Sequence, residues 1–257
     1  GPVFPRPLFL GARTSVFPPA HLPGSGVTGT RRARSVPPAP PRSNAAPGRS
    51  LAGLYAVTPD LTDTADLLER VEQALAGGVT LVQYRNKTAA AALRHAQAAA
   101  LLECCRRHGA RLVINDDLPL ALAIGADGVH LGRGDGDLAA ARAALGSGRL
   151  LGASCYDELE RARAARRLGA DYVAFGSFFA SPTKPAAVRA PLTLLAAAKK
   201  EVGLPLCAIG GITLDHAPQL VAAGADLLAV ISDLFAAPDI RARARAYTSL
   251  FSERVTS

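Results

Sequence analysis

Apolar runs of about five residues recur along the chain from residue 51 onward, and most of them follow a glycine. The runs are continuous rather than alternating, which is typical of parallel strands that are buried on both faces. A helix-like stretch precedes each glycine, and glycine most readily adopts the left-handed conformation that ends a helix. The pattern predicts eight strands, at residues 54–58, 79–85, 111–115, 127–132, 150–154, 171–176, 204–211 and 226–232.

The segments between these strands have the periodicity of helices. In residues 65–76, Leu68, Val71 and Leu75 are spaced to share one face, and the charged residues fall elsewhere. The link between the third and fourth strands is short but contains the apolar stretch LPLALAIG. Strands that alternate with helices and right-handed crossovers form parallel sheets covered by helices.

Eight such units in residues 51–257 predict an α/β fold of the (β/α)8 TIM-barrel type. The competing architecture is an open, doubly wound sheet. No G-x-G-x-x-G motif follows the first strand, and polar residues recur after nearly every strand. The missing motif argues against a doubly wound sheet. The recurring polar residues favour the barrel, because barrel active sites are built from the ends of many strands.

Residues 1–50 differ from the rest of the chain in composition. They contain seven Arg and 11 of the 19 prolines, and no acidic residue. Such a segment has little apolar surface to pack and cannot sustain a helix, so we predict a disordered extension. A dispensable tail and a targeting segment are both compatible with this composition.

Charge and hydropathy narrow the possible partners. The formal net charge is +8, but residues 51–257 contain 22 basic and 21 acidic side chains. The barrel itself is therefore nearly neutral, and we expect no nucleic-acid partner. No apolar run approaches the ~20 residues that span a bilayer, so we expect no membrane association. The four cysteines show no zinc-like spacing, which predicts reduced thiols and a cytoplasmic protein.

Polar residues follow nearly every predicted strand. In a barrel, the C-terminal ends of the strands converge on one face, which we call the barrel mouth. The mouth therefore collects cationic side chains, carboxylates, amides, hydroxyls and a Gly-Gly turn: Gln83, Arg85, Lys87, Asn115, Asp116, Asp117, His130, Asp135, Ser154, Ser181, Thr183, Lys184, Gly210, Gly211 and Ser232. This combination is suited to anionic ligands.

One group of these residues predicts a metal-assisted anion site. Arg85 and Lys87 can together neutralise a multiply charged anion. Asp116 and Asp135 follow neighbouring strands, and such a pair suits a Mg²⁺ ion that keeps waters and also binds substrate phosphates. Asp117 precedes Leu118-Pro119 and is expected to cap the following helix instead.

A second group predicts a phosphate site after the seventh and eighth strands. Gly210-Gly211 allows close backbone approach, and barrels commonly bind phosphate with the loops at this position. The segment 178–185 lacks helical periodicity and carries hydroxyls and Lys184, as expected for a lid that excludes water. His130 is compatible with either a packed strand residue or a base.

Two anion sites and no strong nucleophile indicate a particular kind of chemistry. We expect a metal-bound pyrophosphate to leave and a second bound substrate to attack, with positioning and charge lowering the barrier.

The motifs LYAVTPD, GGVTLVQYRNK, LVINDD, GADGVHLG followed by Asp135, LGAS, SPTK, AIGGI and AGADLLAVIS occur in this order between about residues 54 and 235. This ordered set resembles the thiamine-phosphate synthase (thiamine-phosphate pyrophosphorylase) family. The resemblance implies a transferase of thiamine biosynthesis. It would condense 4-amino-2-methyl-5-(diphosphooxymethyl)pyrimidine with a thiazole phosphate, after Mg²⁺-assisted loss of pyrophosphate.

The resemblance also implies a role for each matching residue. The Mg²⁺ ligands would be Asp116 and Asp135, and the catalytic residues would be Arg85, Lys87, Ser154 and Lys184. The pyrimidine pyrophosphate would contact Gln83, Tyr84, Arg85, Asn86, Lys87, Asn115, Ser154 and Lys184. The thiazole phosphate would contact Ser181, Pro182, Thr183, Gly211, Ile231 and Ser232. The expected partners are thus small phosphorylated substrates, with a homo-oligomer left open.

The sequence departs from the family pattern next to one metal ligand. The family usually reads H-x-G-Q-E-D, whereas this chain has Arg133 and Gly134 before Asp135. Two alternative functions would require different residues. A thiazole tautomerase would carry a His where this chain has Tyr156, and a non-enzymatic phosphate-binding barrel would need neither Lys184 nor the paired carboxylates.

Overall fold

A computed structural model of the chain describes residues 51–181, 186 and 189–252. The predictions for residues 1–50 and for Pro182, Thr183 and Lys184 therefore lie outside the described residues. Eight parallel strands form a closed barrel in the order of the sequence. They are β1 (Gly53–Val57), β2 (Leu81–Tyr84), β3 (Arg111–Asn115), β4 (Gly128–Leu131), β5 (Leu150–Tyr156), β6 (Tyr172–Phe175), β7 (Leu206–Ala208) and β8 (Leu227–Val230).

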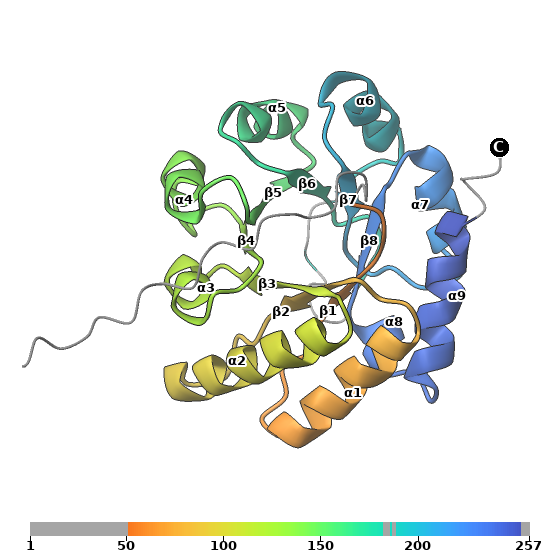
Figure 1. Cartoon of the computed structure of the whole chain (residues 1–257). Coiled ribbons are helices and arrows are strands. Elements are labelled where there is room, and N and C mark those ends of the chain that lie inside the picture. The colour runs from red at the N-terminus through yellow and green to blue at the C-terminus, as the bar shows by residue number, and fades with distance from the viewer. Residues whose placement is uncertain (1–50, 182–185, 187–188, 253–257) are drawn as a thin grey trace, which may run out of the picture. The chain divides into compact units, whose positions relative to one another are not determined.

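The helices lie outside the ring of strands, as Figure 1 shows. They are α1 (Thr64–Ala76), α2 (Ala91–Arg107), α3 (Leu118–Ile124), α4 (Leu138–Leu145), α5 (Leu159–Arg167), α6 (Thr193–Glu201), α7 (Ala217–Ala223), α8 (Ser232–Phe235) and α9 (Ile240–Ser252). The pairing of β1 with β8 closes the barrel, for example between Tyr55 and Ala229. The predicted (β/α)8 architecture is confirmed. The predicted seventh strand is longer than β7, because Gly210 and Gly211 belong to the turn that follows it.

The main core fills the layer between the strands and the helices. In α1, Leu67, Val71 and Leu75 are buried, whereas Leu68 is only partly buried. Val71 and Leu75 thus lie on the buried face as predicted, but the third leucine on that face is Leu67 and not Leu68. Helix α9 packs against α1 and β1, beside the junction where the barrel closes (Figure 1).

Helix α3 shows how short connections are fixed by their ends. Asp117 precedes this helix, and its Oδ1 accepts a hydrogen bond of 2.9 Å from the N–H of Leu120. At the other end, Gly125 has a φ of 70°, the left-handed conformation that glycine favours. The predicted helix cap at Asp117 is thus confirmed.

A second, smaller core fills the inside of the barrel. It includes Tyr55, Leu81, Val113, Tyr172, Ala174, Cys207 and Leu227. All four cysteines are free and buried, and burial raises the pKa of each thiol. Among the described residues, no helix combines the length and the apolar character that crossing a membrane requires.

Candidate active site

The loop after β2 is held in place by the loop after β1. Thr58 is fully buried, and its hydroxyl accepts a 2.9 Å hydrogen bond from the N–H of Arg85. The carboxylate of Asp60 accepts a 3.0 Å hydrogen bond from the N–H of Lys87 and lies 3.4 Å from the Arg85 guanidinium. These contacts fix the backbone from which the Arg85 and Lys87 side chains extend.

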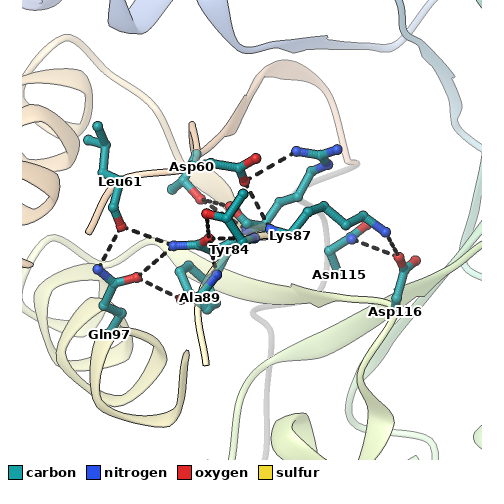
Figure 2. A network of polar contacts seen from close by, with 12 residues as sticks. Asp60, Leu61, Tyr84, Lys87, Ala89, Gln97, Asn115 and Asp116 are labelled. Atoms are coloured by element: carbon teal, nitrogen blue, oxygen red, sulfur yellow. Dashed lines mark hydrogen bonds and ion pairs between the residues drawn. The ribbon is translucent and has the colours of Figure 1, made fainter. Parts of the chain in front are cut away.

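Tyr84 and Asn86 both bond to Gln97 of α2, whereas Lys87 extends toward Asp116 (Figure 2). The Tyr84 hydroxyl donates to Gln97 Oε1 over 2.7 Å, and the Asn86 amide donates to the same oxygen over 3.1 Å. Asn86 also donates to the carbonyl of Leu61, and its Oδ1 accepts from the N–H of Ala89. Both side chains therefore support the loop.

Lys87 reaches from β2 to the end of β3 (Figure 2). Its Nζ lies 2.5 Å from Oδ2 of Asp116, and Asn115 donates to the same oxygen over 2.9 Å. Asp116 has a φ of 60°, which a non-glycine residue adopts only rarely and which is common at functional sites. Beside these residues, a cavity of about 260 Å³ lies between the ends of β2 and β3 and the helices α2 and α3.

Asp135 completes a carboxylate pair with Asp116. Burial raises the pKa of Asp116, but hydrogen bonds with Lys87 and Asp135 outweigh this effect and lower it. Burial and the neighbouring Asp116 raise the pKa of Asp135. The two predicted metal ligands therefore lie together, close enough to compete for a proton. Within the described part of the chain, no set of three or more His, Cys, Asp or Glu side chains forms a metal cage.

This donor set fits Mg²⁺ better than a metal that requires several protein ligands. Mg²⁺ usually binds through one or two carboxylates, waters and substrate phosphates. A divalent cation would also neutralise the repulsion that raises the pKa of Asp135.

The loop 132–136 is held by backbone contacts. The N–H of Gly132 donates to Asp135 Oδ2 over 2.9 Å, and the N–H of Arg133 donates to the Tyr156 hydroxyl over 3.0 Å. The Arg133 guanidinium pairs with Glu158 and lies 5.0 Å from the centre of the Tyr156 ring. The positive charge of Arg133, which the Gln of the usual family pattern lacks, is therefore balanced by Glu158.

The ends of β7 and β8 bring the predicted phosphate-binding residues to neighbouring positions. Ile231 and Ser232 follow β8 directly, and Gly210 and Gly211 follow β7. A Cβ on Gly211 would lie 2.3 Å from the carbonyl oxygen of Ala180. Glycine is thus required here by the close approach of the segment that leads to Ser181, in addition to any approach of a phosphate.

A chain of polar side chains crosses the interior of the barrel. Gln83 Nε2 donates to the Tyr55 hydroxyl over 2.9 Å, and the Tyr55 and Tyr172 hydroxyls lie 2.7 Å apart. Tyr172 lies 3.0 Å from His130 Nδ1, and His130 Nε2 lies 2.8 Å from Ser154 Oγ. Burial lowers the pKa of His130 to about 4, so its imidazole is neutral near pH 7.

The residues that support this site are not among those predicted from the sequence. Thr58 and Asp60 lie in the quoted LYAVTPD motif but received no role, and Tyr55, Tyr172 and Gln97 were not singled out. The signal for the tyrosines was available: a polar atom inside an apolar strand needs a buried partner.

The chain matches a known protein family over most of its length. The family model described as thiamine monophosphate synthase matches residues 54–234. The chain is 58% identical over 205 residues to a thiamine-phosphate synthase of Aromatoleum aromaticum, covering 80% of this chain and 99% of that protein. It is 57% identical over 205 residues to a thiamine-phosphate synthase of Azoarcus sp. (strain BH72), covering 80% and 100%.

One solved structure is similar to this chain in both sequence and fold. It is a thiamine phosphate pyrophosphorylase from Pyrococcus furiosus, with a TM-score of 0.69 and 33% identity, covering 80% of this chain and 98% of that one.

Proposed function

Because this chain belongs to the thiamine monophosphate synthase family and is a transferase that makes thiamine phosphate, we propose that its barrel mouth binds two phosphorylated substrates side by side. The observation that carries this proposal is the cluster of Lys87, Asn115, Asp116 and Asp135 at the ends of adjacent strands. It combines a cation, an amide donor and a carboxylate pair, which together suit a pyrophosphate with its metal ion.

The pyrimidine pyrophosphate would occupy the side of the mouth formed by β2, β3 and β5. Arg85, Lys87 and Asn115 would contact the pyrophosphate, with Lys184 as a further cation. Gln83 and Ser154 would contact the pyrimidine ring. Tyr84 and Asn86 would act by fixing the loop, because their side chains bond to Gln97 and Leu61.

Asp116 and Asp135 would hold Mg²⁺ on this same side. When bound, Mg²⁺ would neutralise charge that accumulates on the departing pyrophosphate. Lys87 pairs with Asp116, and we propose that its ammonium also contacts the pyrophosphate when the substrate and the ion bind.

The thiazole phosphate would occupy the side formed by β6, β7 and β8. Its contacts would come from Ser181, Pro182, Thr183, Gly211, Ile231 and Ser232. The two strands β7 and β8 pair directly, so the Gly-Gly turn and Ile231-Ser232 can approach one phosphate from two loops.

The chain's residues then act by position and charge. The cations draw electron density into the leaving pyrophosphate, and the pyrimidine methylene carbon becomes cationic as its bond to oxygen breaks. The thiazole nitrogen, held on the other side, forms the new bond to that carbon. His130 is neutral, buried and bonded on both ring nitrogens, so we assign it no role as a base.

Further observations concern the alternative function, the partners and the cellular location. Tyr156 occupies the position of the tautomerase histidine and contacts the loop 132–136, which supports the synthase over a tautomerase. We propose that the partners are small phosphorylated molecules, without nucleic acid or membrane. Four buried thiols support a cytoplasmic location.

The experiment is a thiamine phosphate assay with both phosphorylated precursors, with and without Mg²⁺. We expect Mg²⁺-dependent product from the wild type. Asp116→Asn should lose at least about 100-fold in kcat, as removal of one electrostatic group commonly does. A folded Asp116→Asn protein that retains wild-type Mg²⁺ dependence would refute the metal assignment, and a wild type without product would refute the function.

A further inference from the structure

The two residues proposed to contact the pyrimidine ring, Gln83 and Ser154, are connected through the barrel interior. Gln83 comes from β2 and Ser154 from β5, and Tyr55, Tyr172 and His130 link them by four consecutive hydrogen bonds. Tyr55 and Tyr172 are 1% and 0% exposed, and Gln83 and His130 are each 6% exposed. Water therefore has little access to these bonds, and the chain must satisfy its own donors and acceptors.

Each hydroxyl in this chain of hydrogen bonds has one proton, so the direction of one hydrogen bond fixes the direction of the next. Gln83 Nε2 donates to Tyr55. Tyr55 must then donate to Tyr172, and Tyr172 must donate to His130 Nδ1. A neutral imidazole with an accepting Nδ1 carries its proton on Nε2, which donates to Ser154 Oγ. The Ser154 hydroxyl proton is left for a ligand.

The opposite end of the chain is fixed in the same way. With Nε2 of Gln83 engaged by Tyr55, its Oε1 is the atom left to accept a hydrogen bond, and no described residue donates to it. The chain of hydrogen bonds thus presents a ligand with an acceptor at Gln83 and a donor at Ser154. If every bond were reversed, Gln83 would present a donor and Ser154 an acceptor.

We infer that Tyr55, Tyr172 and His130 are positioning residues that set this polarity and thereby select an aminopyrimidine over an oxopyrimidine. An amino group donates and the ring nitrogen of an aminopyrimidine accepts, which matches the acceptor at Gln83 and the donor at Ser154. In an oxopyrimidine the oxo group accepts and a ring N–H donates, which matches neither. This inference rests on the proposed binding of the pyrimidine by Gln83 and Ser154.

The kinetic test compares the aminopyrimidine pyrophosphate with its oxo analogue, using the full-length protein. We expect Tyr172→Phe and Tyr55→Phe to lower kcat/KM for the amino substrate about tenfold, the effect of about one hydrogen bond. The ratio of kcat/KM between the two pyrimidines should fall by the same factor, and KM for the thiazole phosphate should not change. Cys207→Ala is the control, because Cys207 packs in the same inner core but is not a link in the chain.

A second measurement reads the polarity directly, without substrate. In protein with ¹⁵N-labelled histidine, and with His130→Gln for assignment, we expect His130 to carry its proton on Nε2. A proton on Nδ1 would overturn the inference, as would wild-type discrimination in both folded Phe variants. A wild type that makes no thiamine phosphate would refute the proposed function instead, and the labelled histidine distinguishes the two failures.

Discussion

Gly152 lies in the middle of β5, where two aromatic rings from other strands approach its backbone. A Cβ added at this position would lie 2.2 Å from Cζ of Tyr172 and 2.5 Å from Nδ1 of His130. Real Cβ atoms do not come this close to other heavy atoms, so Gly152→Ala requires a ring or the strand to move. Tyr172 is fully buried and stacks on His130 with ring centres 5.6 Å apart, so neither ring has free space beside it.

The cost can be estimated from what must move. Overpacking a well-filled core costs about 1–3 kcal/mol. Displacing Tyr172 also breaks its hydrogen bonds to Tyr55 and His130, and each such bond contributes about 1 kcal/mol. We therefore expect Gly152→Ala to lower the free energy of unfolding by about 3–5 kcal/mol, a large share of the ~5–15 kcal/mol of a typical domain.

Urea denaturation of the purified variants, followed by circular dichroism, measures this difference. Gly148→Ala is the matched control, because a Cβ at Gly148 would meet nothing within 4 Å and its φ is not in the left-handed region. The control should keep wild-type stability within about 1 kcal/mol. If Gly152→Ala were as stable as Gly148→Ala, the close packing of Tyr172 and His130 against β5 would be wrong.

Three further expectations concern single contacts. Asp117→Ala should cost about 1 kcal/mol of stability through the lost cap of α3, with kcat unchanged, as thermal unfolding and steady-state assays would show. Tyr156→Phe removes the acceptor for the N–H of Arg133 and should raise the Mg²⁺ concentration for half-maximal rate about fivefold, measured by Mg²⁺ titration of activity. Burial raises the pKa of Asp233, but hydrogen bonds from Tyr247 and Arg243 outweigh it and lower the pKa, so its ionised form stabilises the fold. This contribution to the free energy of unfolding is present above the unfolded pKa of about 4 and is lost as the pH falls through the lower folded pKa. The difference in stability between wild type and Asp233→Asn should therefore shrink below about pH 4, as urea denaturation at a series of pH values would show.

The barrel was predictable because its signal is repeated. Each continuous apolar run behind a glycine is ambiguous alone, but eight of them in alternation with helices leave few arrangements. The ends of the strands limit which residues can meet, which is why Lys87, Asp116 and Asp135 could be expected to lie together although they are far apart in the sequence.

Side-chain direction within the loops was not predictable to the same degree. Alternation places Gln83, Arg85 and Lys87 on one side of an extended segment, but it does not say that Asn86 is enclosed by Leu61 and Gln97. Those partners lie 25 and 11 residues away from Asn86 in the sequence, so only the tertiary packing brings them together. The buried chain of hydrogen bonds has the same origin, since Tyr172 of β6 bonds to Tyr55 of β1 and to His130 of β4, and β6 pairs with neither strand.

The loop before Asp135 shows how one position of a family pattern can change while the contacts that hold the loop stay in place. The contacts that hold the loop 132–136 use the backbone N–H groups of Gly132 and Arg133, which any residue except proline at position 133 would leave in place. Tyr156, with a φ of 56° at an irregularity in the pairing of β5 with β6, supplies the hydroxyl acceptor and a ring face for Arg133. Glu158 then pairs with the guanidinium and balances its charge. The side chain at position 133 is thus free to change, whereas Gly134 has a φ of 87°, a left-handed conformation that favours glycine. Gly132, Asp135 and Tyr156 carry the shape of the proposed metal loop.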